Sequence, residues 1–115
     1  MPCSALLGSG MTVTIPAPVI GEVDWLGRRR GRPEAGAVLL GSVIDGSLLV
    51  VDLDLEDWAR VRELVDRYAD LPLNVVDASV VTVAERLEQT TIATLDHRHF
   101  SVVRPRHVAA FTLVP

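Results

Sequence analysis

Two aspartates in the last third of the chain stand where carboxylates of α/β proteins often take part in chemistry. Asp77 falls in the first turn of an expected helix, and Asp96 directly follows an expected strand at 91–95. Ligands of open α/β sheets gather beyond the carboxyl ends of the strands, and carboxylate oxygens are the ligands that hard divalent cations prefer. The placement of Asp77 and Asp96 therefore predicts a metal site.

Histidines after Asp96 leave another kind of metal site open. His97, His99 and His107 offer nitrogen donors, and Zn²⁺ accepts both nitrogen and oxygen ligands. His97 and His99 are separated by one residue on a segment that leaves a strand, and no third ligand stands at a recognised zinc spacing. A zinc hydrolase or a structural zinc site is the alternative that the spacing supports less.

The elements that must position these residues follow from the periodicity of the apolar residues. β-branched and apolar runs predict strands at 11–15, 47–53, 91–95 and 110–114. Helical spacing predicts helices at about 18–27, 33–40, 54–68 and 74–87. Asp54 and Asn74 suit the caps of the last two helices, and residues 96–107 form a charged connection. Helices that alternate with short apolar strands favour a parallel α/β sheet.

Composition indicates one compact domain. The chain has 115 residues, of which 49% are hydrophobic, enough for a single core. The longest apolar run, 75–83, contains Asp77 and is too short to span a bilayer. The amino terminus lacks the basic segment of a secretory signal, and the single Cys3 excludes an intrachain disulfide and a thiolate metal cage. We expect a cytoplasmic protein without a membrane segment.

Charge is distributed unevenly along the chain. The net charge of −4 argues against binding to nucleic acid through bulk positive charge, yet Arg28, Arg29, Arg30 and Arg32 form a basic run. This run is either a solvated helix-end connection or a patch that contacts phosphate. We expect Trp25 and Trp58 to fill the core or a protein interface rather than to stack on bases. The remaining helix acids are expected to be exposed: Asp24, Glu85 and Glu88.

Several stretches of the chain carry a family resemblance when they are taken together and in order. They read Ile15-Pro-Ala-Pro-Val-Ile-Gly-Glu-Val-Asp-Trp-Leu, Tyr68-Ala-Asp-Leu-Pro-Leu with Val76-Asp-Ala-Ser, Ala84-Glu-Arg-Leu, and Ile92-Ala-Thr-Leu-Asp-His-Arg-His-Phe. With these motifs, residues 12–115 resemble the PIN-domain ribonucleases, specifically the VapC-like toxins of bacterial type II toxin–antitoxin pairs. The order and spacing of the motifs make the resemblance specific, since an acid at a helix start or strand end is common.

The resemblance implies a PIN-like, three-layer α/β/α fold with a parallel sheet, formed by residues 1–115 as a single domain. It also implies an RNA phosphodiesterase that uses Mg²⁺ or Mn²⁺, held by acidic residues at the carboxyl ends of the strands. The acids that map here are Glu22, Asp77 and Asp96, as catalytic metal ligands, and Glu22 alternatively orients a water. Each also has an ordinary reading: a solvated helix residue for Glu22, an acid favoured by the helix dipole for Asp77, and a turn residue for Asp96.

The first acid of the family has no counterpart in this chain. In the family it ends an amino-terminal strand, but too few residues precede Glu22 to hold that strand and its helices. Residues 3–10 instead resemble the end of the family's second helix, so we expect an amino-terminally truncated fold. The missing strand lies at the centre of the family's sheet, and its loss would leave backbone groups unpaired. A start codon placed too far downstream, a remnant without activity, and a fragment completed by a partner each explain such a chain.

Two functions follow as expectations from the resemblance. The first is an Mg²⁺-dependent endoribonuclease toxin, held inactive by a cognate VapB-like antitoxin that covers the groove near residues 22–40. The second is a catalytically inactive PIN-like module that only binds antitoxin or RNA. The family's habit of dimerising makes a homodimer reasonable. The RNA target is not encoded by any motif, because it depends on groove shape and flanking contacts.

Overall fold

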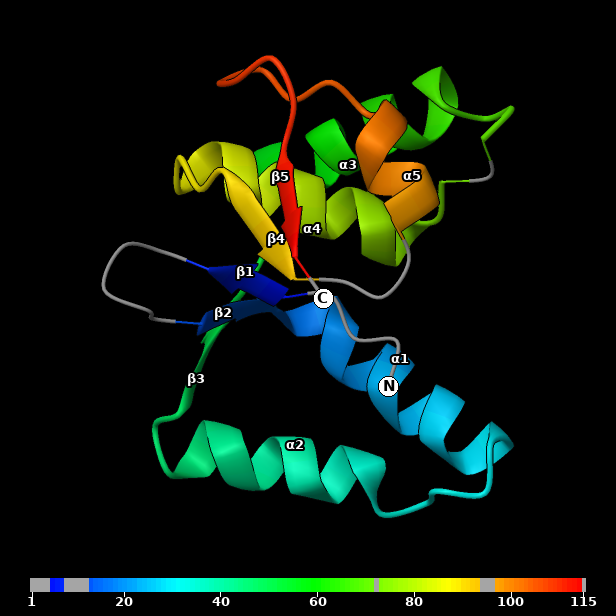
Figure 1. Ribbon diagram of the computed structural model, residues 1–115, viewed down its shortest axis with the longest axis vertical. Coiled ribbons are helices and arrows are strands. Elements are labelled where there is room, and N and C mark those ends of the chain that lie inside the picture. The colour runs from blue at the N-terminus through cyan, green and yellow to red at the C-terminus, as the bar shows by residue number, and fades with distance from the viewer. Residues whose placement is uncertain (1–4, 8–12, 72, 94–96, 115) are drawn as a thin grey trace.

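A computed structural model describes residues 5–7, 13–71, 73–93 and 97–114 of the chain (Figure 1). Strands occupy β1 (Ala5–Leu7), β2 (Val13–Pro16), β3 (Leu48–Val51), β4 (Thr91–Ala93) and β5 (Thr112–Val114). Helices occupy α1 (Ala17–Arg29), α2 (Ala35–Ile44), α3 (Leu55–Arg67), α4 (Val75–Arg86) and α5 (His97–Val102). The alternation of strands and helices is the mixed α/β architecture that the sequence predicts.

The five strands form one sheet in the order β3-β2-β1-β4-β5. The β2–β3 and β4–β5 pairs are parallel, whereas β1 runs antiparallel to both of its neighbours. Leu6 at the middle of β1 pairs with Thr14 on one side and with Ile92 on the other. The prediction of a purely parallel sheet is therefore wrong at its centre.

The place of β1 also corrects what was expected of the first residues. Ala5–Leu7 form the central strand rather than the end of a helix, so the two parallel pairs are bridged and not separated by a gap. A strand at this place satisfies backbone groups of both neighbours. Only a short connection joins β1 to β2, which permits a hairpin but not the crossover of a dozen or more residues that a parallel pair requires.

The helices form two groups beside the sheet. Figure 1 places α3, α4 and α5 together in its upper half, and α1 with α2 in its lower half. The core is centred on α4, whose residues from Ala78 to Ala84 are all buried. Ser79 and Thr82 are satisfied within the helix, because their hydroxyls donate to the carbonyls of Val76 at 2.6 Å and Ala78 at 2.8 Å. Ile15 and Ile92 of the sheet and Leu64 of α3 belong to the same buried core cluster.

Some element bounds differ from those predicted, for reasons of packing. α1 continues past Gly27 to Arg29, because Gly27 is buried against the following turn and does not end the helix. The segment that was expected to be only a connection contains α5, whose Phe100 is buried, as is Val103 beyond its end. In the described part of the chain, no helix has the length and apolar character needed to cross a membrane.

Candidate functional site

Glu22 lies near the middle of α1, the helix that starts directly after β2. Pro16 is extended and Pro18 occupies the first turn, where a missing N–H costs nothing. Val19 and Val23 are buried on the face of α1 that points to the core. Glu22 is half-buried beside this face, and α1 packs against α4. The local sequence therefore places one carboxylate at the contact of the two helices.

Asp77 lies in the first turn of α4. The side chain of Asn74 caps this helix by accepting a hydrogen bond from the backbone N–H of Asp77 at 2.8 Å, as the sequence predicts. The cap fixes the backbone at Asp77, and a negative charge in the first turn is favoured by the helix dipole. Asp77 is half-buried. The amino-terminal turn of α4 thus holds the second carboxylate.

The structure brings Glu22 and Asp77 into electrostatic contact. Burial raises the pKa of the Glu22 carboxyl, and the nearby negative charge of Asp77 raises it further. Like charges on half-buried carboxylates disfavour simultaneous ionisation, and a cation between them removes that cost. The structure therefore places the two carboxylates, which belong to different helices, near enough for the charge of Asp77 to act on Glu22.

This pair fits a hard divalent cation in donor type. Mg²⁺ is typically held by one or two carboxylates together with waters and substrate phosphate oxygens, so two adjacent carboxylates supply the protein ligands that such an ion needs. Asp96, the third predicted ligand, lies outside the described residues. Within the described ranges, no group of three or more His, Cys, Asp or Glu residues is arranged to hold a metal. Strand β1, composed of Ala5–Leu7, adds no acid.

His107, the described histidine of the zinc alternative, is engaged elsewhere. Its Nε2 lies 2.6 Å from the carbonyl oxygen of Gln89, and its ring meets Phe111 edge-on with centroids 5.9 Å apart. Among the described residues, the buried Nδ1 meets no hydrogen-bond partner. The side chains of His97 and His99 lie outside the described part of the chain. His107 thus fixes the carboxyl-terminal segment against the end of α4.

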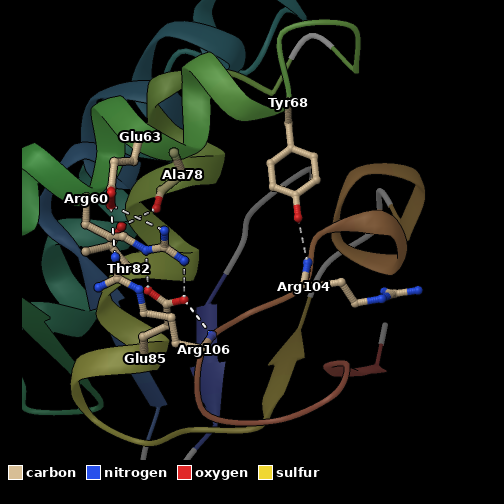
Figure 2. Close-up of polar contacts among 8 residues, drawn as sticks. All are labelled: Arg60, Glu63, Tyr68, Ala78, Thr82, Glu85, Arg104 and Arg106. Carbon is tan, nitrogen blue, oxygen red and sulfur yellow. Dashed lines mark hydrogen bonds and ion pairs between the residues drawn. The ribbon is translucent and has the colours of Figure 1, made fainter.

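A buried ion pair joins α3 to α4, as Figure 2 shows. Arg60 donates to both oxygens of Glu85, from Nε at 2.9 Å and from Nη2 at 2.8 Å. The backbone N–H of Arg106 donates to the same carboxylate at 2.8 Å. The side chains of Arg60 and Glu85 are only 10% and 9% exposed. The expectation that Glu85 is an exposed helix acid is therefore wrong.

The sequence holds a signal for this pairing. Arg60 shares a helical face with the buried Val61 and Leu64, and a charge on such a face needs a partner. With Arg106, the pair lines a pocket of about 340 Å³. Arg106 Nη2 also donates to Glu63 at 2.9 Å. These charges neutralise one another, so the network fastens α3, α4 and the segment after α5 together.

An apolar pocket of about 390 Å³ lies between α1 and α2, within the region where an antitoxin was expected. The two helices approach closely at glycines, since a Cβ on Gly36 would lie 2.5 Å from Asp24 Oδ1. The pocket is lined by Ile20, Gly21, Asp24, Arg28, Pro33, Gly36, Ala37 and Leu40. Large apolar side chains remain exposed on α2: Val38, Leu40 and Ile44.

Both tryptophans are at the surface. Trp25 is 57% exposed and Trp58 is 42% exposed, so neither fills the core, and the other expectation, a protein interface, stays a prediction. Asp24, which was expected to be exposed, is partly covered and forms an ion pair with Arg28 at 3.2 Å. The arginines of the basic run are exposed. Sequence periodicity did not reveal the exposure of Trp25 and Trp58, because it depends on how α1 and α3 pack in the fold.

Comparison with known proteins agrees with this arrangement. The PIN-domain family model matches residues 3–104. The chain is 29% identical over 113 residues to Ribonuclease VapC26 of Mycobacterium tuberculosis (strain ATCC 25618 / H37Rv), a match that covers 97% of this chain and 84% of the relative. A match of this extent includes both helices that carry Glu22 and Asp77, and the family implies the α/β/α arrangement of layers. The chain therefore belongs to the PIN-domain family.

Proposed function

We propose that this protein is a metal-dependent endoribonuclease toxin of a type II toxin–antitoxin pair. The observation that carries the proposal is the Glu22–Asp77 pair, two half-buried carboxylates whose charges oppose each other where α1 meets α4. The relation to a protein named as a ribonuclease supports RNA as the substrate. Asp96 is proposed as a third ligand on the strength of the family motif. A single domain over residues 1–115 remains our prediction.

Mg²⁺ or Mn²⁺ is the proposed cofactor. When bound, such an ion would activate a water and stabilise the charge that develops on the phosphate. Glu22 and Asp77 would hold the ion from two helices, and the cap from Asn74 keeps Asp77 in position. The partial burial of Glu22 limits competition by bulk water at the pair. Thus the contribution of these residues is to position the ion and to balance its charge.

A VapB-like antitoxin is the proposed regulatory partner. The apolar pocket between α1 and α2 is lined by residues of α1, the helix that also carries Glu22, among them Ile20 and Gly21, so a segment bound there would contact the helix that carries one of the two carboxylates. An apolar helix in a groove is a common form of such recognition. A homodimer and a cytoplasmic location complete the proposal by analogy with the family.

RNA cleavage by the intact chain tests the proposal. Cleavage is measured with Mg²⁺ or Mn²⁺, with a chelator, and with the variants Asp77→Asn and Asp66→Asn. Asp66 is an exposed acid on α3 and serves as the matched control. We expect cleavage that requires metal, is lost in Asp77→Asn and is retained in Asp66→Asn. Cleavage that persists equally in Asp77→Asn would refute the assignment of the site.

A catalytically inactive module is the second candidate. The observation that favours it is that the central strand β1 contributes no acid to the carboxylate pair. A folded chain that binds RNA or an antitoxin peptide but shows no cleavage with either metal would support this candidate. The predicted truncation, with loss of the family's first acid, stays a prediction although β1 occupies the centre of the sheet, and the intact mass of the natively expressed protein tests it against the 12.5 kDa of this chain.

A further inference from the structure

The far end of α1 combines an exposed indole with a run of exposed guanidinium groups. Trp25 is 57% exposed although Cζ of Arg29 lies 4.9 Å from its ring centroid. The neighbouring Arg30 and Arg32 are exposed. Among the described residues, neither Arg30 nor Arg32 forms an ion pair with a carboxylate. An aromatic surface is thus surrounded by positive charge that the rest of the described chain does not neutralise.

Stability of the helix explains only part of this arrangement. Arg28 and Arg29 lie in the last turn of α1, where cations complement the helix dipole. Arg28 also pairs with Asp24. Neither the helix dipole nor the ion pair with Asp24 accounts for a solvent-exposed indole at Trp25. Neither accounts for Arg30 and Arg32, because these arginines follow the helix. Exposed aromatic side chains with a polar rim are typical of binding surfaces.

Helix geometry places this surface on the same side of α1 as Glu22. Glu22, Trp25 and Arg29 have the i, i+3, i+7 spacing of one helical face. At the rise of an α-helix, Trp25 lies about 5 Å and Arg29 about 10 Å beyond Glu22 along the axis. A single nucleic-acid strand covers about 10 Å in roughly three nucleotides. A strand held at the carboxylate pair therefore reaches Trp25 within a few nucleotides.

The backbone that carries the last arginines is fixed by hydrogen bonds. The N–H groups of Arg30 and Arg32 both donate to the carbonyl of Gly27, at 3.2 Å and 2.7 Å, and the N–H of Ala35 donates to the carbonyl of Arg32 at 3.1 Å. Gly31 between them adopts a φ of 76°, which glycine tolerates without strain. The turn is thus ordered before any ligand binds, which lowers the entropic cost of binding.

We propose that Trp25, Arg29, Arg30 and Arg32 form a binding site for single-stranded RNA next to the position of cleavage. The proposal rests on the proposed ribonuclease function. An unpaired base stacks on the indole of Trp25, and the guanidinium groups contact the adjacent phosphates. Arginine suits phosphate because of its planar, permanently charged donor group. The strand must be single, because paired bases do not expose their faces. The apolar pocket between α1 and α2, not this surface, suits a protein partner.

Binding of a fluorescein-labelled, single-stranded RNA of about twelve nucleotides, followed by fluorescence anisotropy, tests the proposal. The full chain carries Asp77→Asn and a chelator is present, so that binding is measured without cleavage. We expect Trp25→Ala to weaken binding about ten-fold, the loss of one stacked base, and Trp25→Phe to restore most of it. Replacing Arg30 by Ala is expected to reduce the salt dependence of log K by about 0.7. A duplex of the same sequence is expected to show no dependence on Trp25.

Matched controls come from α3. Arg67 lies 5.7 Å from the ring centroid of Tyr68, a similar cation–π pair on another helix, and Trp58 is the other exposed indole. Arg67→Ala and Trp58→Ala are expected to bind RNA like the parent, and thermal melting confirms that each variant is folded. Unchanged affinity in a folded Trp25→Ala variant, or a parent that binds no RNA, would overturn the proposal and assign the indole to a protein contact.

Cleavage by the wild-type chain separates this proposal from the proposed function. Metal-dependent cleavage together with RNA binding that ignores Trp25 would refute the binding site and leave the ribonuclease function intact. RNA binding that depends on Trp25, without cleavage in either metal, would support the binding site and refute the ribonuclease function. The two experiments use the same RNA, so their results are directly comparable.

Discussion

The negative charge of Asp77 on α4 raises the pKa of Glu22 on α1, in addition to the effect of burial. The two side chains belong to helices that are distant in sequence and packed together in space. This repulsion opposes ionisation of Glu22 in the native state. This cost makes the pair measurable by stability as well as by activity.

Glu22→Gln is expected to increase the free energy of unfolding at pH 7 in metal-free buffer by up to about 1 kcal/mol, allowing for solvent screening. Because the folded-state pKa of Glu22 lies above its ordinary value of 4.5, the native wild type binds more protons than the unfolded chain between the two values. Its stability therefore falls as the pH rises through that window. Denaturant unfolding of the wild type and the variant from pH 4 to pH 8 measures this dependence of stability on pH.

The increase in the free energy of unfolding from Glu22→Gln should vanish below pH 4.5, the ordinary pKa, because Glu22 of the wild type is then protonated in both the folded and the unfolded state. Mg²⁺ should stabilise the wild type more than the variant, since only the wild type has both carboxylates. Glu88→Gln, at an exposed position, is the control. A Glu22→Gln variant that is less stable than the wild type at pH 7 would contradict the repulsion.

Glu85→Gln is expected to lower the free energy of unfolding by about 3 kcal/mol, because the buried Arg60 would lose its closest charged partner and keep only the longer contact, 3.4 Å, to the more exposed Glu63. Burial acts to raise the pKa of Glu85, but hydrogen bonds from Arg60 and Arg106 outweigh it and hold that pKa below its ordinary value. The contribution is present above the ordinary pKa of 4.5 and is lost as the pH falls through the folded-state pKa. The difference in the free energy of unfolding between the wild type and Glu85→Gln should therefore become smaller at acidic pH.

The exposed pair Arg62–Asp66 provides the control for Glu85. Its side chains are 86% and 72% exposed, so Asp66→Asn should change stability by less than about 0.5 kcal/mol. Equal effects of Glu85→Gln and Asp66→Asn in denaturant unfolding would show that the buried network does not stabilise the contact of α3 with α4.

Gly27→Ala is expected to destabilise the protein by about 1–3 kcal/mol. An added Cβ would lie 2.6 Å from the carbonyl oxygen of Arg32 and 2.7 Å from the Cβ of Ala35, and the backbone has little freedom to move away. Gly41→Ala is the matched control, since its Cβ would meet nothing within 4 Å in the described structure. That variant should be more stable by about 0.5–1 kcal/mol. In thermal unfolding, the melting temperature should fall for Gly27→Ala and rise for Gly41→Ala.

Asn74→Ala is expected to cost about 1 kcal/mol of stability, because the side chain caps α4 through the N–H of Asp77. Asn74→Ser keeps an acceptor at the cap and should retain most of that stability. Mg²⁺-dependent cleavage is expected to fall in Asn74→Ala and to recover in Asn74→Ser. Identical stability of the two variants would show that the cap is not needed to hold Asp77.

Local features of this protein were determined by the sequence alone. The caps at Asp54 and Asn74 agree with the structure, and the helix predicted at about 18–27 is present and buries Val19 and Val23. Helix caps and apolar stripes depend on residues three or four positions apart, so they can be predicted without knowledge of the fold. Membership of the PIN-domain family was also predicted from ordered motifs and is confirmed by the family match, whereas the roles of Glu22 and Asp77 as metal ligands stay predictions. The role of Asp96 as a metal ligand also stays a prediction.

Only the tertiary structure decided which distant groups meet. Ala5–Leu7 lie antiparallel between β2 and β4, and Glu85 is buried against Arg60. Asp77 lies near enough to Glu22 to raise its pKa, and the side chain of Trp25 is exposed to solvent. Each outcome depends on how helices and strands pack over long sequence separations, where burial and charge are set by neighbours that no local pattern specifies. The sequence therefore determined the carboxylates and their helices, whereas packing determined their pairing.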